Sequence, residues 1–227
     1  MITGQGMVAS AFRAFADDDR IHVFASGVSR SIERDQAPFR REIELITAQR
    51  YVPGRFIYFS SCSVFDPSLK ESPYIHHKLA VEDLIRQLYR DHLILRLPNL
   101  VGRTKNPNTL TNFLHDRIAR DEFFELHTHA CRYLLDVDDA VADLSPILLL
   151  PELGGATLDV CARIPIALSD LVHAMEQVLG KKARVIPLSK GSCYTIDNEH
   201  FMSKLPVARR AAYAHADTMA LLKKYYG

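Results

Sequence analysis

A tyrosine and a lysine stand four positions apart in the segment Tyr74-Ile75-His76-His77-Lys78. On a helix, residues with this spacing lie on one face and can act on the same substrate atom. A phenol, with a pKa of about 10, exchanges protons poorly at neutral pH, but a neighbouring ammonium group favours the phenolate. Tyr74 could therefore act as a general acid or base with Lys78 beside it. The same pair is also common on solvated helix faces.

A run of hydroxyl side chains, Ser60-Ser61-Cys62-Ser63, follows the apolar stretch 56–59, and Ser61 precedes Tyr74 by 13 residues. If the stretch is a buried strand, these hydroxyls emerge at the carboxyl edge of a sheet, where open α/β sheets bind ligands. A hydroxyl there could hold a substrate carbonyl or alcohol while Tyr74 moves the proton. A serine-rich turn is the alternative, but it does not explain the spacing to Tyr74.

Two glycines, in the pattern Gly4-x-Gly6-x-x-Ala9, lie between a short apolar start and a helical segment. In this context glycines let a pyrophosphate approach backbone N–H groups at the positive end of a helix. The pattern by itself is equally compatible with a tight turn that binds nothing.

The elements that must position these groups alternate along the chain. Helical segments are predicted at 8–15, at 74–89 and around Phe39, Ile43 and Ile46, and strands at 21–26, 56–59 and 92–97. Further strands are predicted near 157–161 and 182–186, with a helix at 169–179 that Gly180 ends. This order predicts an α/β fold with a doubly wound parallel sheet of Rossmann type.

The composition excludes several classes of protein. The 227 residues carry a formal charge of +1, from 28 basic and 27 acidic side chains, which predicts no nucleic-acid partner. The longest apolar run, near 147–150, is far shorter than the roughly 20 residues of a membrane span, and no basic-then-apolar leader opens the chain. We expect a cytoplasmic protein that does not enter a membrane.

The four cysteines are Cys62, Cys131, Cys161 and Cys193, and none forms a C-x-x-C pair. Their wide spacing favours free thiols in a reducing cytosol over a disulfide framework.

Two further motifs could hold a metal ion. In a strand, His127-x-His129-x-Cys131 could present three zinc ligands on one face, but no fourth ligand accompanies them, and a polar strand edge is the favoured interpretation. The carboxylates of Asp136-x-Asp138-Asp139 are better explained as the cap of a helix at 140–149. We therefore predict no metal site.

Taken together, these motifs resemble the extended short-chain dehydrogenase/reductases, also called NAD-dependent epimerase/dehydratases of nucleotide sugars, almost from end to end. The resemblance is carried in order by T-G-Q-G-M-V-A, F-S-S-C-S-V-F, S-P-Y-I-H-H-K-L-A-V-E, L-R-L-P-N-L-V-G and R-Y-L-L-D-V-D-D-A-V.

The resemblance implies a role for each matching residue. Ser61 would be the catalytic hydroxyl, Tyr74 the acid/base, and Lys78 the residue that binds the nicotinamide ribose and tunes Tyr74. Cofactor contacts would also come from Thr3, Gly4, Gly6, Met7 and Val8 around the pyrophosphate, from Ala25 and Ser26 at the middle, and from Leu97 to Leu100 at the nicotinamide edge. Ser63, Asn99, Thr109 and Arg132 would face the substrate.

Three departures from the family refine this expectation. Cys62 and Ser63 stand where its dehydratases have acidic residues, which disfavours a 4,6-dehydratase. Only 14 residues separate Gly6 from Ile21, room for one crossover where the family has two further strands, so the adenosine end is shortened. The first strand also has almost no N-terminal half, which predicts weak cofactor affinity.

Ser29-Arg30-Ser31 could bind the 2′-phosphate of NADP, so the choice between NAD and NADP stays open.

The sequence thus predicts an NAD- or NADP-dependent oxidoreductase or epimerase acting on a nucleotide sugar, in polysaccharide or glycosylated-metabolite assembly. A cofactor lobe is expected at 1–98, completed by 133–161, and a substrate lobe at 99–132 and 162–227. A homodimer is expected through helices at 39–49 and 74–89. The rival prediction is a non-catalytic binding or regulatory protein that kept the fold with a weakened cofactor site.

Overall fold

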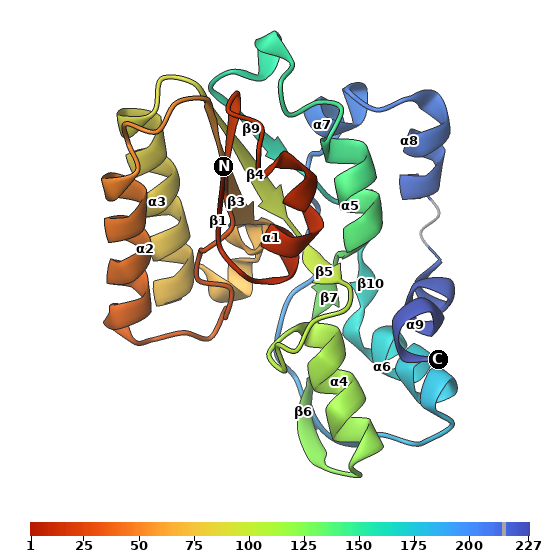
Figure 1. The fold of residues 1–227 in the computed structure, drawn as a ribbon. Helices are drawn as coiled ribbons and strands as arrows, with labels where there is room; N and C mark the ends of the chain where they lie inside the picture. The colour runs from red at the N-terminus through yellow and green to blue at the C-terminus, as the bar shows by residue number, and fades with distance from the viewer. Residues whose placement is uncertain (215–216) are drawn as a thin grey trace.

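The computed structural model describes residues 1–214 and 217–227, and its centre is a five-stranded parallel sheet in the order β1-β2-β3-β4-β9 (Figure 1). These strands are β1 (Ile2–Thr3), β2 (Ile21–Phe24), β3 (Arg55–Ser61), β4 (His92–Leu97) and β9 (Ala156–Asp159). The helices are α1 (Met7–Ala11), α2 (Gln36–Ala48), α3 (Pro73–Leu88), α4 (Leu110–Ala119), α5 (Val137–Leu144), α6 (Leu168–Leu179), α7 (Glu199–Ser203), α8 (Val207–Ala214) and α9 (Thr218–Tyr226). Short 3₁₀ segments are η1 (Arg13–Phe15), η2 (Cys62–Phe65), η3 (Pro67–Leu69) and η4 (Pro151–Leu153).

Both faces of this sheet are covered by helices. Successive side chains of a strand point to opposite faces, and on β4 Leu93 and Leu95 join a core with α5, whereas Ile94 joins a core with α2 and α3. Helices α2 and α3 lie on one side and α1 and α5 on the other (Figure 1). The predicted doubly wound α/β fold is confirmed.

The first strand forms one edge of the sheet. β1 pairs only with β2 among the described residues, with Thr3 opposite Phe24, and the chain between them forms only α1 and η1. The predicted single crossover between Gly6 and Ile21 is therefore present, and no strand covers the outer side of β1 in the described part of the chain.

The remaining strands form three pairs outside this sheet: β5 (Asn99–Val101) with β8 (Leu134–Asp136), β6 (Phe123–His127) with β11 (Arg184–Leu188), and β7 (Cys131–Arg132) with β10 (Ile166–Ala167). A second apolar cluster joins α4, α6 and α9 with these pairs. Phe201, Leu205 and Tyr213, from the predicted substrate lobe, instead pack in the core of the central sheet. The two-lobe division stays a prediction.

Several local expectations change. Helix α1 ends at Ala11 rather than continuing to Phe15, and α5 covers 137–144 rather than 140–149. Asp136 caps α5 through its side chain, and Gly180, at a φ of 62°, ends α6, as expected. Among the described residues, no helix combines the length and apolarity needed to cross a bilayer.

Three apolar residues, Phe39, Ile43 and Ile46, predicted helix α2 by their spacing, but they are not all buried. Phe39 and Ile46 are buried, whereas Ile43 is 38% exposed and Glu42 is fully buried instead. Neighbouring residues on a helix point about 100° apart around its axis, so Glu42 and Ile43 cannot both face the sheet. The polar partners described below determine which one faces the sheet.

Candidate active site

The predicted site residues gather at the carboxyl edge of the central sheet. Because all five strands are parallel, the turns that follow β1, β2, β3 and β4 emerge at the same edge. Ser61 and Leu97 are register partners at the ends of β3 and β4. The glycine turn follows Thr3, and Ala25 and Ser26 follow β2. Segments far apart in the sequence are thereby brought side by side.

The two serines at the end of β3 have different partners. Ser60 is buried and donates its hydroxyl to Glu82 Oε1 at 2.6 Å, so that hydroxyl is occupied within the core. Ser61 Oγ accepts the backbone N–H of Ser63 at 3.1 Å as the cap of η2. Because this oxygen is already an acceptor, its own hydrogen is directed elsewhere and could be donated to a ligand oxygen.

Tyr74 and Lys78 occupy one face of α3, which packs against η2. Pro73 at the first position starts this helix. The Lys78 ammonium lies 5.9 Å from the centre of the Tyr74 ring, and both side chains are almost fully buried. The spacing on the helix therefore produces the juxtaposition that the sequence predicted.

The ammonium of Lys78 is held by groups that the sequence interpretation missed. It donates to Glu42 Oε1 at 3.1 Å and to the Tyr58 hydroxyl at 2.8 Å. The same carboxylate accepts the Tyr58 hydroxyl at 2.6 Å, His77 Nε2 at 2.9 Å and the backbone N–H of Val28 at 2.6 Å. We call Glu42, Tyr58, His77, Lys78 and the Val28 N–H the Glu42 cluster.

The Glu42 cluster keeps its carboxylate ionised. Burial opposes the charge on Glu42, but the Lys78 ammonium and the hydrogen bonds from His77, Tyr58 and Val28 outweigh it and lower the pKa of Glu42 to about 2. Burial, with the Glu42 charge beside it, raises the pKa of Tyr58 well above its usual value. Tyr58 therefore stays a hydrogen-bond donor, and the Lys78–Glu42 pair is net neutral.

The glycine turn combines one crowded glycine with one open one. At Gly4, where φ is 134°, an added Cβ would lie 2.3 Å from the carbonyl oxygen of Ala25, so only glycine allows the two loops to meet. At Gly6, which precedes α1, an added Cβ would have no atom within 4 Å. The turn therefore leaves space above the first N–H groups of α1.

The predicted substrate contacts lie on the neighbouring segments. Asn99 Nδ2 donates to the carbonyl of Tyr133 at 3.2 Å, and Thr109 precedes α4. Arg132 Nη1 donates to the carbonyl of Cys131 at 2.7 Å and lies 3.5 Å from Oδ2 of the buried Asp66. These contacts hold the side chains of Asn99 and Arg132 in place.

Cys131 and Cys193 form a disulfide, which corrects the expectation of four free thiols. The remaining two, Cys62 and Cys161, are free and buried, as expected of small apolar side chains. The disulfide also removes the zinc alternative, since Cys131 has no thiolate to offer and a turn separates it from the strand that ends at His127. In the described part of the chain, no cluster of His, Cys, Asp and Glu side chains could hold a metal ion.

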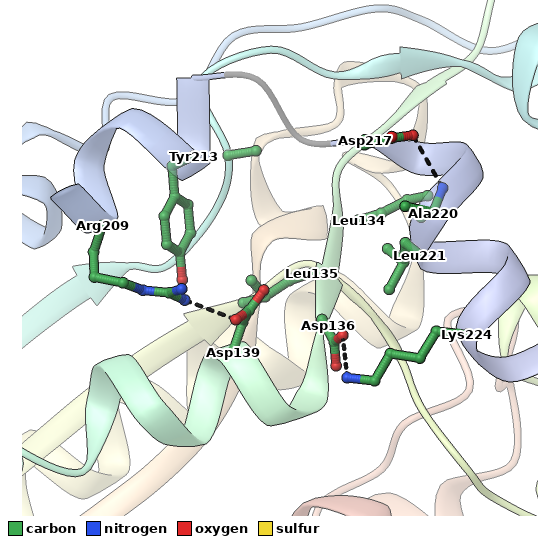
Figure 2. A pocket seen from close by; sticks show the side chains of 11 residues that line it. Leu134, Leu135, Asp136, Asp139, Arg209, Tyr213, Asp217, Ala220, Leu221 and Lys224 are labelled. Carbon is green, nitrogen blue, oxygen red and sulfur yellow. Dashed lines mark hydrogen bonds and ion pairs between the residues drawn. The ribbon is translucent and has the colours of Figure 1, made fainter.

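Two adjoining cavities lie elsewhere, and neither is lined by Ser61, Tyr74 or Lys78. Figure 2 shows the larger, of about 360 Å³, between α5, α8 and α9. Four of its charged side chains form two ion pairs, Arg209 with Asp139 at 2.8 Å and Lys224 with Asp136 at 2.6 Å. The fifth, Asp217, accepts the backbone N–H of Ala220 at 3.0 Å. The smaller, of about 300 Å³, is lined by Arg132. The cavities thus lie beside segments of the predicted substrate lobe, whereas Ser61, Tyr74 and Lys78 lie at the carboxyl edge of the central sheet.

Comparison with known proteins places this architecture in a family. Among solved structures, UDP-glucuronic acid 4-epimerase of Bacillus cereus, in complex with UDP-glucuronic acid and NAD, is similar with a TM-score of 0.73 and 18% identity, over 95% of this chain and 76% of that chain. RMD of Pseudomonas aeruginosa, complexed with NADPH, is similar with a TM-score of 0.71 and 16% identity, over 98% of both chains. At such identities the likeness shows the fold.

A curated relative gives a closer match over a shorter stretch. A ceramide reductase of Caulobacter vibrioides (strain NA1000 / CB15N) is 31% identical over 142 residues, 62% of this chain. The chain spans less than half of that relative's length, since the match covers 43% of it. The model of the NAD dependent epimerase/dehydratase family matches residues 2–148, which include the glycine turn, Ser61 and the helix with Tyr74 and Lys78. The chain therefore belongs to the NAD dependent epimerase/dehydratase family.

Proposed function

We propose that this protein is an NAD- or NADP-dependent oxidoreductase or epimerase that uses Ser61, Tyr74 and Lys78. The observation that carries the proposal is the meeting of β3 and α3 at the carboxyl edge of the sheet, with the Lys78 ammonium 5.9 Å from the Tyr74 ring. A solvated pair on an outer helix face would not be almost fully buried at the ligand-binding edge of an open α/β sheet.

The residues around the glycine turn fit a dinucleotide. Open space above Gly6 would admit a pyrophosphate to the first N–H groups of α1, and the contact of Gly4 with Ala25 joins this turn to the loop after β2. Thr3, Met7, Val8, Ser26, Leu97 and Leu100 complete the proposed cofactor contacts. The nicotinamide, when bound, would supply or accept a hydride.

The side chains of this protein would manage the accompanying proton and oxygen. Ser61 would donate its free hydroxyl hydrogen to the reacting oxygen of the substrate. Tyr74 would give a proton to that oxygen in reduction and remove it in oxidation. Lys78 would direct its third ammonium hydrogen to the cofactor ribose, since its other two are donated to Glu42 and Tyr58.

A nucleotide sugar is the first substrate class that we propose, with Ser63, Asn99, Thr109 and Arg132 on the substrate side. Support comes from the epimerase family and from the nucleotide sugar bound to the Bacillus cereus neighbour. Cys62 and Ser63 follow the proposed catalytic serine, so reduction or epimerisation is favoured over 4,6-dehydration. Polysaccharide or glycosylated-metabolite assembly is the process that we propose for it.

A ceramide-type lipid is the second substrate class. It is favoured by the ceramide reductase relative, whose identity of 31% exceeds the 16–18% of solved neighbours with a bound nucleotide sugar. Both candidates share the Ser-Tyr-Lys chemistry and differ in what the substrate side must bind.

Assembly and location are also proposals. A homodimer would form through α2 and α3, whose outer faces expose Ile43 and Leu79 at 38% and 39%. Light scattering at micromolar concentration tests this, and a monomer of 25.7 kDa would contradict it. A cytoplasmic location stays a prediction that the disulfide does not support, because disulfides are rare in that compartment.

The deciding experiment follows the fluorescence of NADH and NADPH during titration with the protein, and then their oxidation in the presence of each substrate class. Keto sugars linked to UDP, GDP or dTDP form one arm, and a ceramide-type lipid in mixed micelles forms the other. Cofactor consumption that Tyr74→Phe abolishes supports the proposal. No binding of either dinucleotide, even with substrate present, would favour the rival, a non-catalytic Rossmann-type protein.

A further inference from the structure

The buried carboxylate of the Glu42 cluster connects α2 with three other segments of the chain. Glu42 is fully buried on α2, and its two oxygens accept from four groups on three different segments: Lys78 and His77 of α3, Tyr58 of β3, and the Val28 N–H of the loop after β2. Arg41, the neighbouring cation on α2, is directed away from this carboxylate and donates to Ser26 Oγ at 3.0 Å. Lys78 and His77 are therefore the basic side chains that face Glu42.

The loop after β2 closes over the ion pair. At Gly27 an added Cβ would lie 2.8 Å from Glu42 Oε1 and 2.9 Å from Lys78 Nζ. Only glycine, which has no side chain, therefore allows the loop to lie this close to the Lys78–Glu42 pair. The same loop carries Ala25 and Ser26, which we place near the middle of the cofactor, so the cluster connects the cofactor side with Lys78.

We propose that Glu42 is a positioning residue of this site: it fixes the Lys78 ammonium beside Tyr74 and offsets its charge, so that Tyr74 holds its proton to a higher pH than it would beside an unpaired lysine. The inference rests on the proposed function and gives it a direction, because the protonated tyrosine is the form that gives a proton to the carbonyl oxygen in reduction.

The charges and distances support this direction. The Lys78 ammonium lies 5.9 Å from the centre of the Tyr74 ring and would favour the phenolate if it were unpaired. The Glu42 carboxylate, 3.1 Å from the same nitrogen, carries the opposite charge and opposes that effect. The chemistry is balanced: the cofactor gives the hydride to the carbonyl carbon, and Tyr74 gives the proton to the carbonyl oxygen.

The test measures the ionisation of Tyr74 directly and needs no turnover. With ring-¹³C tyrosine and Tyr74→Phe to assign the resonance, the pH midpoint of Tyr74 is compared in the wild type, Glu42→Gln and Glu44→Gln. Glu44 lies on the same helix but is exposed, so its variant is the matched control. We expect Glu42→Gln to lower the midpoint by about one pH unit or more. An unchanged midpoint would overturn the inference.

Glu42→Gln leaves a buried ammonium unpaired, and its fold must be verified by circular dichroism. If this variant does not fold, Lys78→Met is compared with Glu42→Gln/Lys78→Met, in which the carboxylate is the only difference. A higher Tyr74 midpoint in Lys78→Met supports the inference, and equal midpoints overturn it.

Turnover separates this inference from the proposed function. If the wild type oxidises NADH or NADPH with a substrate, its kcat/KM for reduction should decline at high pH, where Tyr74 loses its proton. In Glu42→Gln this decline should move to lower pH by the same shift as the NMR midpoint of Tyr74. A decline that does not move would overturn the role of Glu42 alone. Absence of any cofactor consumption would overturn the proposed function, while the NMR titration would still decide whether Glu42 offsets Lys78.

Discussion

The two ends of the carboxyl edge of the sheet differ in how fully their residues are buried and paired. At one end, which we call the catalytic end after its proposed role, Tyr74, Lys78 and Glu42 are almost fully buried, and every charge has a partner. At the glycine end, β1 is a two-residue edge strand and Gly6 is exposed with open space around it. Under the proposed function, this shortened member of the family keeps the groups for proton transfer at a buried end, whereas its open glycine end offers the adenosine little support.

This comparison makes separable predictions for kcat and for cofactor affinity. Loss of the Tyr74 hydroxyl should lower kcat and spare binding, whereas a change at Gly6 should do the reverse. Lys78, which we propose to bind the cofactor ribose, should affect both. A change at Tyr74 or Gly6 that lowers both equally would show that the two ends act as one unit.

The largest effect is expected for Tyr74→Phe. The ring still packs against Lys78 but has no proton to transfer, so kcat should fall by about 10²–10⁴-fold while the Kd for the dinucleotide stays nearly constant. Steady-state kinetics and calorimetry measure the two quantities. Tyr51→Phe, at a site 80% exposed, is the matched control and should behave as wild type. Wild-type turnover in Tyr74→Phe would rule out the mechanism.

The next effect concerns the disulfide, which joins the substrate-side segment at Cys131 to Cys193 across 62 residues. Cys193→Ser should lower the free energy of unfolding by about 2–4 kcal/mol, because the unfolded chain regains freedom. Chemical denaturation with and without a reductant measures it. With reductant, the free energy of unfolding of the wild type should match that of Cys193→Ser. The value for Cys193→Ser itself should not change when reductant is added. A wild type insensitive to reductant would show that this bond does not form in solution.

A smaller effect is expected at the glycine end as the pH falls. His22 of β2 is fully buried, its Nε2 lies 3.0 Å from Thr3 Oγ1 of β1, and its Nδ1 has no partner among the described residues. Burial, followed by the charge of the chain's amino terminus, lowers the pKa of His22 to about 4.

The unfolded chain therefore binds this proton more readily than the folded one. Stability from a neutral His22 is present above about pH 6.5 and declines as pH falls towards about 4, with a loss of about 2 kcal/mol between about pH 7 and about pH 5. Urea denaturation across this range should show that loss in wild type and in the exposed-site control His200→Gln. In His22→Gln the free energy of unfolding should depend less steeply on pH. An equal slope in all three proteins would contradict the assignment.

The smallest effect is expected for Gly6→Val. With little floor under the adenine, wild-type Kd should lie between tens of micromolar and millimolar, and the added side chain should weaken binding about tenfold, or about 1.4 kcal/mol. Calorimetry with both cofactors measures this, with Ser10→Ala on the same helix as the control. Tight wild-type binding with a strong preference for NADH or NADPH would mean that the shortened end still binds the adenosine fully.

Much of the fold was already determined by the sequence. The alternation of short apolar runs with helical segments predicted the parallel sheet, because local periodicity reports how each element is buried. The ordered motifs around Gly4, Ser61 and Tyr74 predicted the family, and the four-residue spacing placed Lys78 beside Tyr74. Each of these inferences depends on residues near one another in the chain or on the order of whole elements.

Only the tertiary structure decided the long-range pairs. The apolar spacing on α2 includes Ile43, but Glu42 is buried instead because Lys78, Tyr58 and His77 satisfy its charge from other elements. The pairing of Cys131 with Cys193 depends on a turn that brings distant segments together, which their spacing does not encode. Burying a charge or joining two cysteines is favourable only when the partner is already within reach, and only the folded chain determines that distance.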